Sequence, residues 1–113
     1  MADIYLERRL RHRARKYSDM ITVLRMLEAR EELHYGEAAA ALGSSPSYAY
    51  SLMAMMSHMY TIPFRDGVMD NPGKQLLRRI AEDLRNRIQR IRKKLEKTRK
   101  KKKKGRRRAE GKA

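Results

Sequence analysis

The residues best equipped for chemistry in this sequence are lysines and arginines, and they gather toward its two ends. The 113-residue chain holds 29 Lys and Arg against 13 Asp and Glu, a net charge of +16. Residues 1–16 have a net charge of +4, residues 17–73 of −4 and residues 74–113 of +16. Ammonium and guanidinium groups bind phosphate oxygens, and so dense a cluster repels itself unless a polyanion is bound. We therefore expect a polyanion partner, most commonly nucleic acid.

Phosphate-binding cations are expected in an N-terminal arm, in a long helix after residue 71 and in a Lys/Arg-rich tail. If about 6–10 of them met phosphates, affinity would fall by roughly 10³–10⁵ between 50 and 200 mM salt. Such binding follows the backbone and is largely indifferent to base sequence. The expected contacts are Arg8, Arg9, Arg11, Arg13, Arg15, Lys16, Arg85, Arg92, Lys93, Lys94, Lys100, Lys101, Lys102, Lys103, Lys104, Arg106, Arg107 and Arg108.

Catalysis is not expected. The sequence has no paired carboxylates, no Ser/His/Asp set and no glycine-rich phosphate loop. His34 and His58 lack a third ligand at metal spacing, and the absence of cysteine excludes a Cys-based zinc site. We therefore expect no enzyme activity, no metal and no cofactor.

The first half of the chain reads as a series of helices. Residues 3–16 form a weakly amphipathic pattern, and Ser18 is a candidate cap for a new helix that ends near Leu33. A short alanine helix follows over residues 36–43. Ser45-Pro46, a hydroxyl cap followed by proline at the first helical position, predicts a further helix to about residue 60.

The second half begins with a hairpin pattern. Residues 61–64 favour a strand, with Pro63 confining it to a sheet edge, and Asp66-Gly67 predicts a turn before a return strand at residues 68–69. Asn71-Pro72 predicts the start of a helix that runs to about Lys97. The tail beyond it has no apolar face and is expected to be disordered without a polyanion.

An apolar stripe runs along this last helix with an average spacing of 3.6 residues. It packs either on the N-terminal helix, through Ile4 and Leu10, or on the same helix of a second chain. We favour a homodimer, because the stripe extends further than a small domain could cover. The predicted dimer interface is Leu77, Ile80, Leu84, Ile88, Ile91 and Leu95.

Residues 37–53 carry a family resemblance. They combine a small residue at Ala39, Leu42-Gly43 at a turn, Ser45 as a cap and inward-facing apolar positions in the following helix. This resembles the helix-turn-helix of small microbial regulators, and the hairpin and long helix that follow are similar to the MarR/PadR-type winged-helix group. The resemblance covers residues 18–97. It implies a mainly α, winged helix-turn-helix fold with a small β-hairpin wing, a long C-terminal helix and a disordered basic tail.

The expected domain organisation follows from these segments. Residues 1–17 are a basic arm, 18–71 the winged helix-turn-helix core, 72–97 a long basic amphipathic helix and 98–113 the tail.

The resemblance would send the helix over residues 46–60 into the DNA major groove. That helix has no Lys or Arg, so it lacks the bidentate Arg–guanine contact. Arg65 stands where winged-helix proteins often place a minor-groove arginine, although a solvated turn charge beside Asp66 explains it equally well. The contacts expected from this part of the chain are Ser45, Ser47, Tyr48, Ser51 and Arg65.

The leading hypothesis is a DNA-binding winged-helix regulator or chromatin-like architectural factor. The alternatives are a ribosomal or other ribonucleoprotein component that binds rRNA through its tail, and a protein adaptor that uses the Met and Tyr side chains. A polybasic tail also suits an anionic membrane, but the long helix lacks Trp and Phe anchors and no apolar run is long enough to span a bilayer. We expect no membrane partner and a cytoplasmic protein, associated with the nucleoid or the ribosome.

Overall fold

The computed structural model describes the backbone of residues 2–110 and the side chains of residues 4–98. The protein is mainly helical, as predicted, with one small antiparallel sheet. Its elements are, in order, α1 (Ala2–Glu28), β1 (Glu32–His34), α2 (Tyr35–Leu42), α3 (Pro46–Tyr60), β2 (Phe64–Arg65), β3 (Val68–Asp70) and α4 (Lys74–Glu110).

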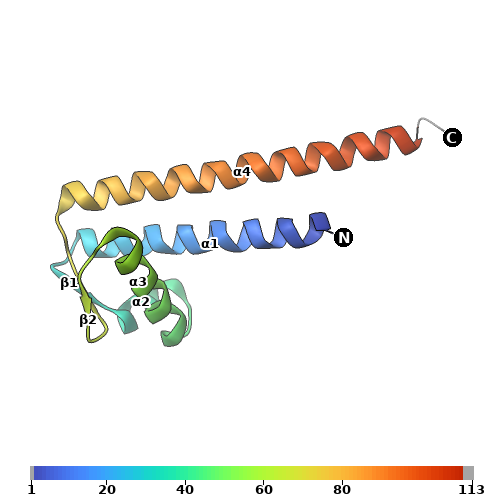
Figure 1. Ribbon diagram of the computed structural model, residues 1–113. Coiled ribbons are helices and arrows are strands. Elements are labelled where there is room, and N and C mark those ends of the chain that lie inside the picture. Colours follow the sequence, from blue (N-terminus) through green and yellow to red (C-terminus); the bar gives the residue numbers. More distant parts are fainter. Residues whose placement is uncertain (1, 111–113) are drawn as a thin grey trace.

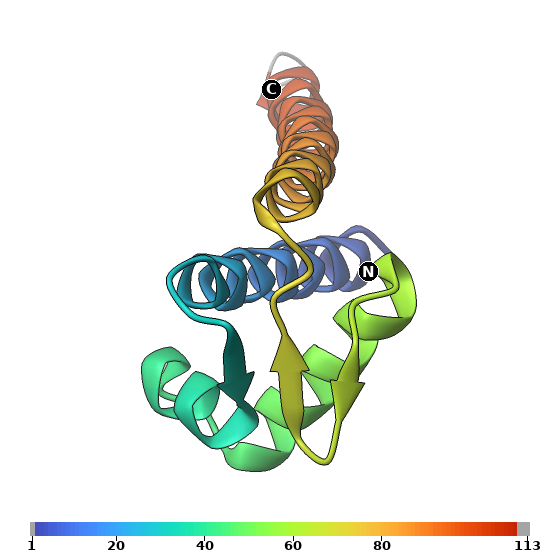
Figure 2. The same ribbon diagram turned by 90° about the vertical axis from the view of Figure 1, so that its left-hand side faces the viewer.

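The two long helices dominate the shape. α1 and α4 pack against each other in opposite directions and diverge toward their free ends (Figures 1 and 2). α2, α3 and the sheet lie on the side of α1 away from α4, around the C-terminal half of α1 (Figure 1). α1 therefore lies between α4 and the rest of the fold, and both helices project beyond the small domain.

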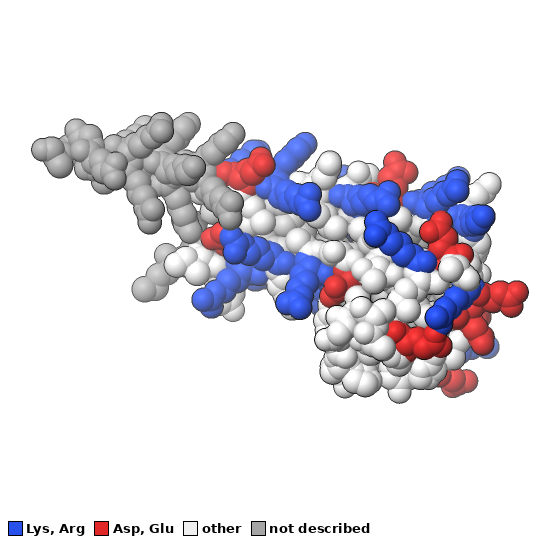
Figure 3. Space-filling model, turned by 180° about the vertical axis from the view of Figure 1, so that it is seen from behind, with Lys and Arg blue, Asp and Glu red and all other residues white. Residues whose placement is uncertain are grey.

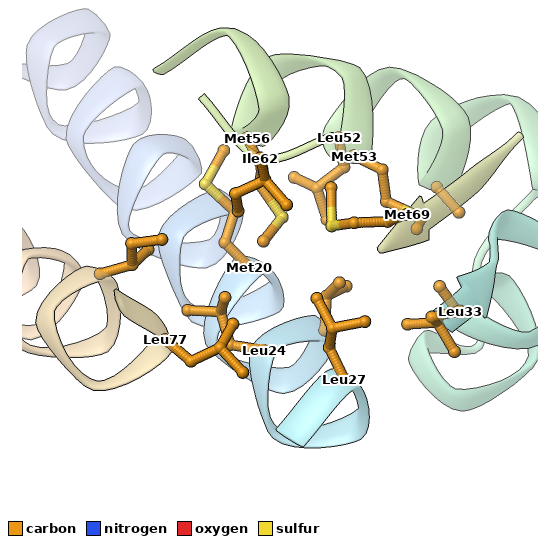
Figure 4. Close-up of a cluster of buried hydrophobic side chains, with 14 of the residues drawn as sticks. Met20, Leu24, Leu27, Leu33, Leu52, Met53, Met56, Ile62, Met69 and Leu77 are labelled. Carbon is orange, nitrogen blue, oxygen red and sulfur yellow. The ribbon is translucent and has the colours of Figure 1, made fainter. Parts of the chain in front are cut away.

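One apolar core joins these elements. Side chains from α1, α3, the sheet and the first turns of α4 meet in it, as Figure 4 shows for Met20, Met53, Met69 and Leu77. Each is at most 2% exposed. Fully burying a side chain of this size contributes about 1.5–3 kcal/mol, so this core is the main source of stability.

The apolar stripe of α4 packs within the chain. Leu77, Ile80 and Leu84 belong to the core, and Ile91 is buried outside it, while Ile88 and Leu95 are half-buried. The structure thus places the stripe against α1, the first of the two readings, and its best-buried side chains do not form a free surface for a second copy. Homodimerisation itself stays a prediction.

The predicted helix start at Ser18 was wrong. α1 is continuous from Ala2 to Glu28, and the Ser18 carbonyl accepts a hydrogen bond from Thr22 Oγ1 (3.3 Å) inside the helix. Buried Met20, Val23 and Leu24 hold this stretch helical, because their packing outweighs the local capping preference of a serine. The boundary drawn between the arm and the core, at residues 17–18, therefore falls within α1.

The predicted turn between α2 and α3 was confirmed. Gly43 adopts φ +63°, and the amide of Ser44 closes α2 on the Ala39 carbonyl (3.0 Å). Ser45 Oγ then accepts a hydrogen bond from the amide of Tyr48 (3.2 Å), and Pro46 begins α3.

The sheet has three strands in the order β1-β3-β2, one more than predicted. β3 pairs with β1 (Leu33 opposite Met69) and with β2, which lies at the edge as Pro63 required. The predicted Asp66-Gly67 turn was confirmed, with φ of 53° and 77°. Thr61 and Ile62 were predicted to lie in a strand but do not, because Thr61 ends α3 in the left-handed conformation.

The long helix begins and ends elsewhere than predicted. Asn71 does not cap it; its Nδ2 donates to the carbonyls of Leu27 and Arg30 (both 2.9 Å), and α4 starts at Lys74. The helix expected to end near Lys97 continues to Glu110. The tail side chains from Arg99 onward, with the predicted contacts at 100–104 and 106–108, lie outside the described residues.

Candidate nucleic-acid interface

Charge is divided between two parts of the molecule. We call residues 4–16 of α1 and 88–98 of α4 the arms, and residues 17–87 the body. The arms hold eleven Lys and Arg against two Glu, a net charge of +9, whereas the body holds eight against nine, a net charge of −1. Figure 3 shows Lys and Arg spread along α1 and α4, with acidic residues concentrated at the end of the body that lies away from the arms.

A groove joins the α1 arm to the exposed face of α3, and we call it the basic groove. It has a volume of about 380 Å³. From α1 it is lined by His12 and Lys16, and from α3 by Ser47, Tyr48, Ser51, Leu52 and Met55. A helix without any Lys or Arg is therefore bordered by a lysine and a histidine from another helix.

A second groove continues from the first around Tyr48. His12, Arg15 and Asp19 of α1 face the turn at residues 42–45 across about 300 Å³. The cationic line also extends the other way, because Arg8 precedes His12 by four residues and lies one turn further along the same face of α1. The α1 arm thus presents a row of cations beside the start of α3.

Tyr48 lines both grooves, and its hydroxyl proton is engaged within the protein. The hydroxyl donates to Asp19 Oδ2 at 2.7 Å, which ties α3 to α1. Burial, helped by this hydrogen bond and by the Asp19 charge, raises the pKa of Tyr48 to about 12. Tyr48 therefore positions α1 against α3, and its contact with nucleic acid stays a prediction.

The predicted contacts that the structure brings together come from α1 and α3. Arg15 and Lys16 lie beside the start of α3, and Ser47 and Ser51 are exposed on its outer face. The Ser45 hydroxyl caps α3. The exposed cations of the α1 arm are Arg8, Arg9, Arg11, which pairs with Glu7 (2.9 Å), Arg13 and Arg15.

Other predicted contacts lie apart from these grooves. Arg85 lines a separate groove between α1 and α4, of about 550 Å³, together with Arg25, Arg78, Glu28 and Glu82. Arg65 is exposed on β2, and Arg92, Lys93 and Lys94 are exposed on the α4 arm.

The nucleic-acid contacts expected from the sequence did not include His12 and Tyr50. His12 lines both grooves, and its spacing of three from Arg15 and four from Lys16 was the available signal, since these positions share one face of a helix. Tyr50 is 46% exposed on α3 and has Tyr35 and Phe64 as ring neighbours, from elements distant in sequence.

The direction of α4 is set by a hydrogen-bonded group at its exit from the body. Tyr60 Oη donates to Asp83 Oδ2 (2.7 Å), and Arg87 Nε donates to the same oxygen (3.0 Å). The Arg87 guanidinium also lies 5.8 Å from the ring centre of Tyr17. The Tyr60 hydrogen bond, with Arg87, lowers the pKa of Asp83, and burial raises the pKa of Tyr60 well above its ordinary value.

Among the described residues, no group of three or more His, Asp or Glu side chains is placed to hold a metal ion. Within the same part of the chain, no helix is long and apolar enough to cross a membrane. Comparisons of the chain with models of protein families, with curated proteins and with solved structures found no match.

Proposed function

We propose that this chain is a winged helix-turn-helix protein that binds nucleic acid, with DNA as the favoured partner. Its role would be that of a transcriptional regulator or a chromatin-like architectural factor. The order of its elements, α1-β1-α2-α3-β2-β3, supports this proposal, with the hairpin of β2 and β3 as the wing. The observation that carries it is the basic groove, where Lys16 and His12 of α1 border the exposed face of α3.

In this mechanism, affinity and placement come from different elements. The α1 arm binds phosphates through Arg8, Arg15 and Lys16, and the α4 arm adds further contacts that do not depend on sequence. α3 lies against the nucleic acid with Ser47 and Ser51, whose hydroxyls can reach phosphate or base atoms. The uncharged helix needs no arginine of its own to be held there, because α1 supplies the charge.

The second candidate is a structural component of a ribonucleoprotein. The arms favour it, since they project beyond the body with a net charge of +9 and could enter the space between RNA helices (Figure 1). In that role the body, with a net charge of −1, would face solvent or a protein.

The proposal is tested by replacing three cations of the α1 face beside α3 with glutamine in R8Q/R15Q/K16Q; Lys16 lines the basic groove, Arg15 the second groove, and Arg8 lies further along the same face. Each phosphate contact contributes about 0.9 to the slope of log K against log salt on duplex DNA. We expect the slope to fall by about 2–3 units, measured by fluorescence anisotropy over a salt series. The matched control is R25Q/R78Q/R79Q, which removes the same charge from the α1 and α4 surfaces of the body and should change the slope by less than about one unit.

If the salt-dependence slope fell equally in the two triple variants, the basic groove would be rejected as the binding site. Net charge alone would then explain the binding. Recovery of bound nucleic acid from a native lysate then separates the two candidates. Predominantly ribosomal RNA supports the ribonucleoprotein component and contradicts the DNA regulator.

A further inference from the structure

Three aromatic rings from separate elements meet beside α3. The Tyr50 ring lies 5.3 Å from that of Tyr35 in α2, at an interplanar angle of 87°, and 5.2 Å from that of Phe64 in β2, at 58°. Contacts of this kind contribute about 0.5–1.5 kcal/mol each beyond simple burial. Tyr50 is therefore held from two sides, yet 46% of it remains exposed.

The bracing of Tyr50 extends into the hairpin turn. A Cβ added at Gly67 would lie 2.6 Å from Cδ1 of Tyr35, so the glycine leaves room for the ring that contacts Tyr50. Gly67 also has φ +77°, which a residue with a side chain adopts only with strain. The position of Tyr50 is thus fixed by α2, by β2 and by the turn after it.

An open groove of about 350 Å³ lies at this ring. Its five lining residues are uncharged: Tyr35, Pro46, Ser47, Tyr50 and Ser51. Ser47 and Ser51 also line the basic groove, so the two grooves meet along one face of α3. A ligand that spans them would meet cations on the α1 side and an aromatic ring on the other.

We infer that Tyr50 is a stacking platform for an unpaired base of a single-stranded nucleic acid whose phosphates lie along α1. This inference rests on the proposed binding of nucleic acid, and it assigns Tyr50 to single-stranded segments and not to an intact duplex. A single strand combines a charged backbone with exposed flat base faces, which matches a cationic groove beside an uncharged aromatic one. In an intact duplex the base faces are covered by neighbouring bases, so the ring would have nothing to stack on.

Tyr50→Trp provides a direct test, because the chain has no tryptophan and the new indole would be its only one. Stacking of a base on this indole should quench its fluorescence when the full-length protein is titrated with oligo(dT). Heparin, a polyanion without bases, should bind at low salt and leave the fluorescence unchanged. Anisotropy of a labelled oligo(dT), and displacement of it by heparin, confirms that binding occurs in each case.

Two further variants separate stacking from simple apolar contact. Tyr50→Phe keeps the ring and should retain affinity for oligo(dT) within about twofold. Tyr50→Leu keeps apolar volume without a flat ring and should lose about 5- to 150-fold, the range for one stacked base. Tyr5→Leu, on the α1 arm and 72% exposed, is the matched control and should lose less than about twofold.

The outcomes distinguish the inference from the proposed function. Quenching by oligo(dT) alone, with loss in Tyr50→Leu, supports both. Binding of oligo(dT) without quenching, or equal affinities of Tyr50→Leu and the unsubstituted protein, overturns the platform and leaves nucleic-acid binding standing. Failure of the unsubstituted protein to bind oligo(dT) and duplex DNA at low salt overturns both.

Discussion

In the body, sixteen buried side chains form one continuous core, whereas Leu10 and Ile91 are the buried apolar side chains of the described arms. The charges are distributed in the opposite way, with a net +9 on the arms and −1 on the body. Mutual repulsion is weakest where the chain must be compact, and the cations stand where the helices diverge and solvent or a polyanion can screen them. The fold is therefore specified by one part of the molecule and the proposed affinity for nucleic acid by another.

Because the core lies in the body, a substitution that creates a cavity there should destabilise the whole protein. Leu84 of α4 is 0% exposed, and Leu84→Ala should lower the free energy of unfolding by about 2–5 kcal/mol. The matched control on the same helix is Leu76→Ala, 36% exposed, which should change it by less than about 0.5 kcal/mol. Urea unfolding followed by circular dichroism measures both. A loss of less than about 0.5 kcal/mol in Leu84→Ala would contradict the place of α4 in the core.

A smaller loss is predicted where α4 leaves the body for its arm. Tyr60→Phe removes the hydrogen bond to Asp83, and bonds to charged groups contribute about 1.5–3 kcal/mol. Because Asp83 is half-exposed, we expect the low end of that range. The exposed Tyr5→Phe is the control and should be neutral within about 0.5 kcal/mol.

The pH dependence of the Tyr60→Phe effect has a definite sign. The pKa of Asp83 is lowered by folding, so its contribution to stability is full above its ordinary value of 3.8 and is lost as pH falls through the folded value. The difference in unfolding free energy between the two proteins should therefore shrink in acid below about pH 4. A difference that stays constant down to pH 2 would contradict the role of the Asp83 carboxylate.

The features of this fold that could be predicted from the sequence are those determined by residues adjacent in the chain. The cap at Ser45 and the turn at Asp66-Gly67 depend on a few adjacent side chains and backbone angles, and both were found as expected. The three-residue β1 has too little sequence to show a strand period, and its partner β3 begins 34 residues after its last residue, His34. Asn71 binds carbonyls more than forty residues earlier, which no local pattern indicates.

The same distinction explains the candidate site. The cations of α1 could be read directly from composition, but their position beside α3 depends on the packing of two helices that are separated by 17 residues of sequence. The ring contacts of Tyr50 likewise join α2, α3 and β2. Residue types therefore predicted the kind of ligand, and tertiary packing selected the residues that face one groove.

The smallest predicted effect tests how α1 is held where it leaves the body and becomes an arm. Tyr48→Phe removes the hydrogen bond to the Asp19 carboxylate and should cost no more than about 1.5 kcal/mol at neutral pH, the low end of the range for charged partners, because Asp19 is half-exposed. Folding raises the pKa of Tyr48 from 10.0 to about 12, so its contribution is full below pH 10 and is lost as pH rises toward 12. The unfolding free energies of the unsubstituted protein and Tyr48→Phe, measured from pH 8 to pH 12 by urea titration, should therefore converge at the alkaline end. Equal unfolding free energies of the two proteins already at neutral pH would mean that Tyr48 positions α1 through ring packing alone. The basic groove would then depend on apolar contacts of the body, as the core does, and the hydroxyl of Tyr48 would have no part in orienting the arm.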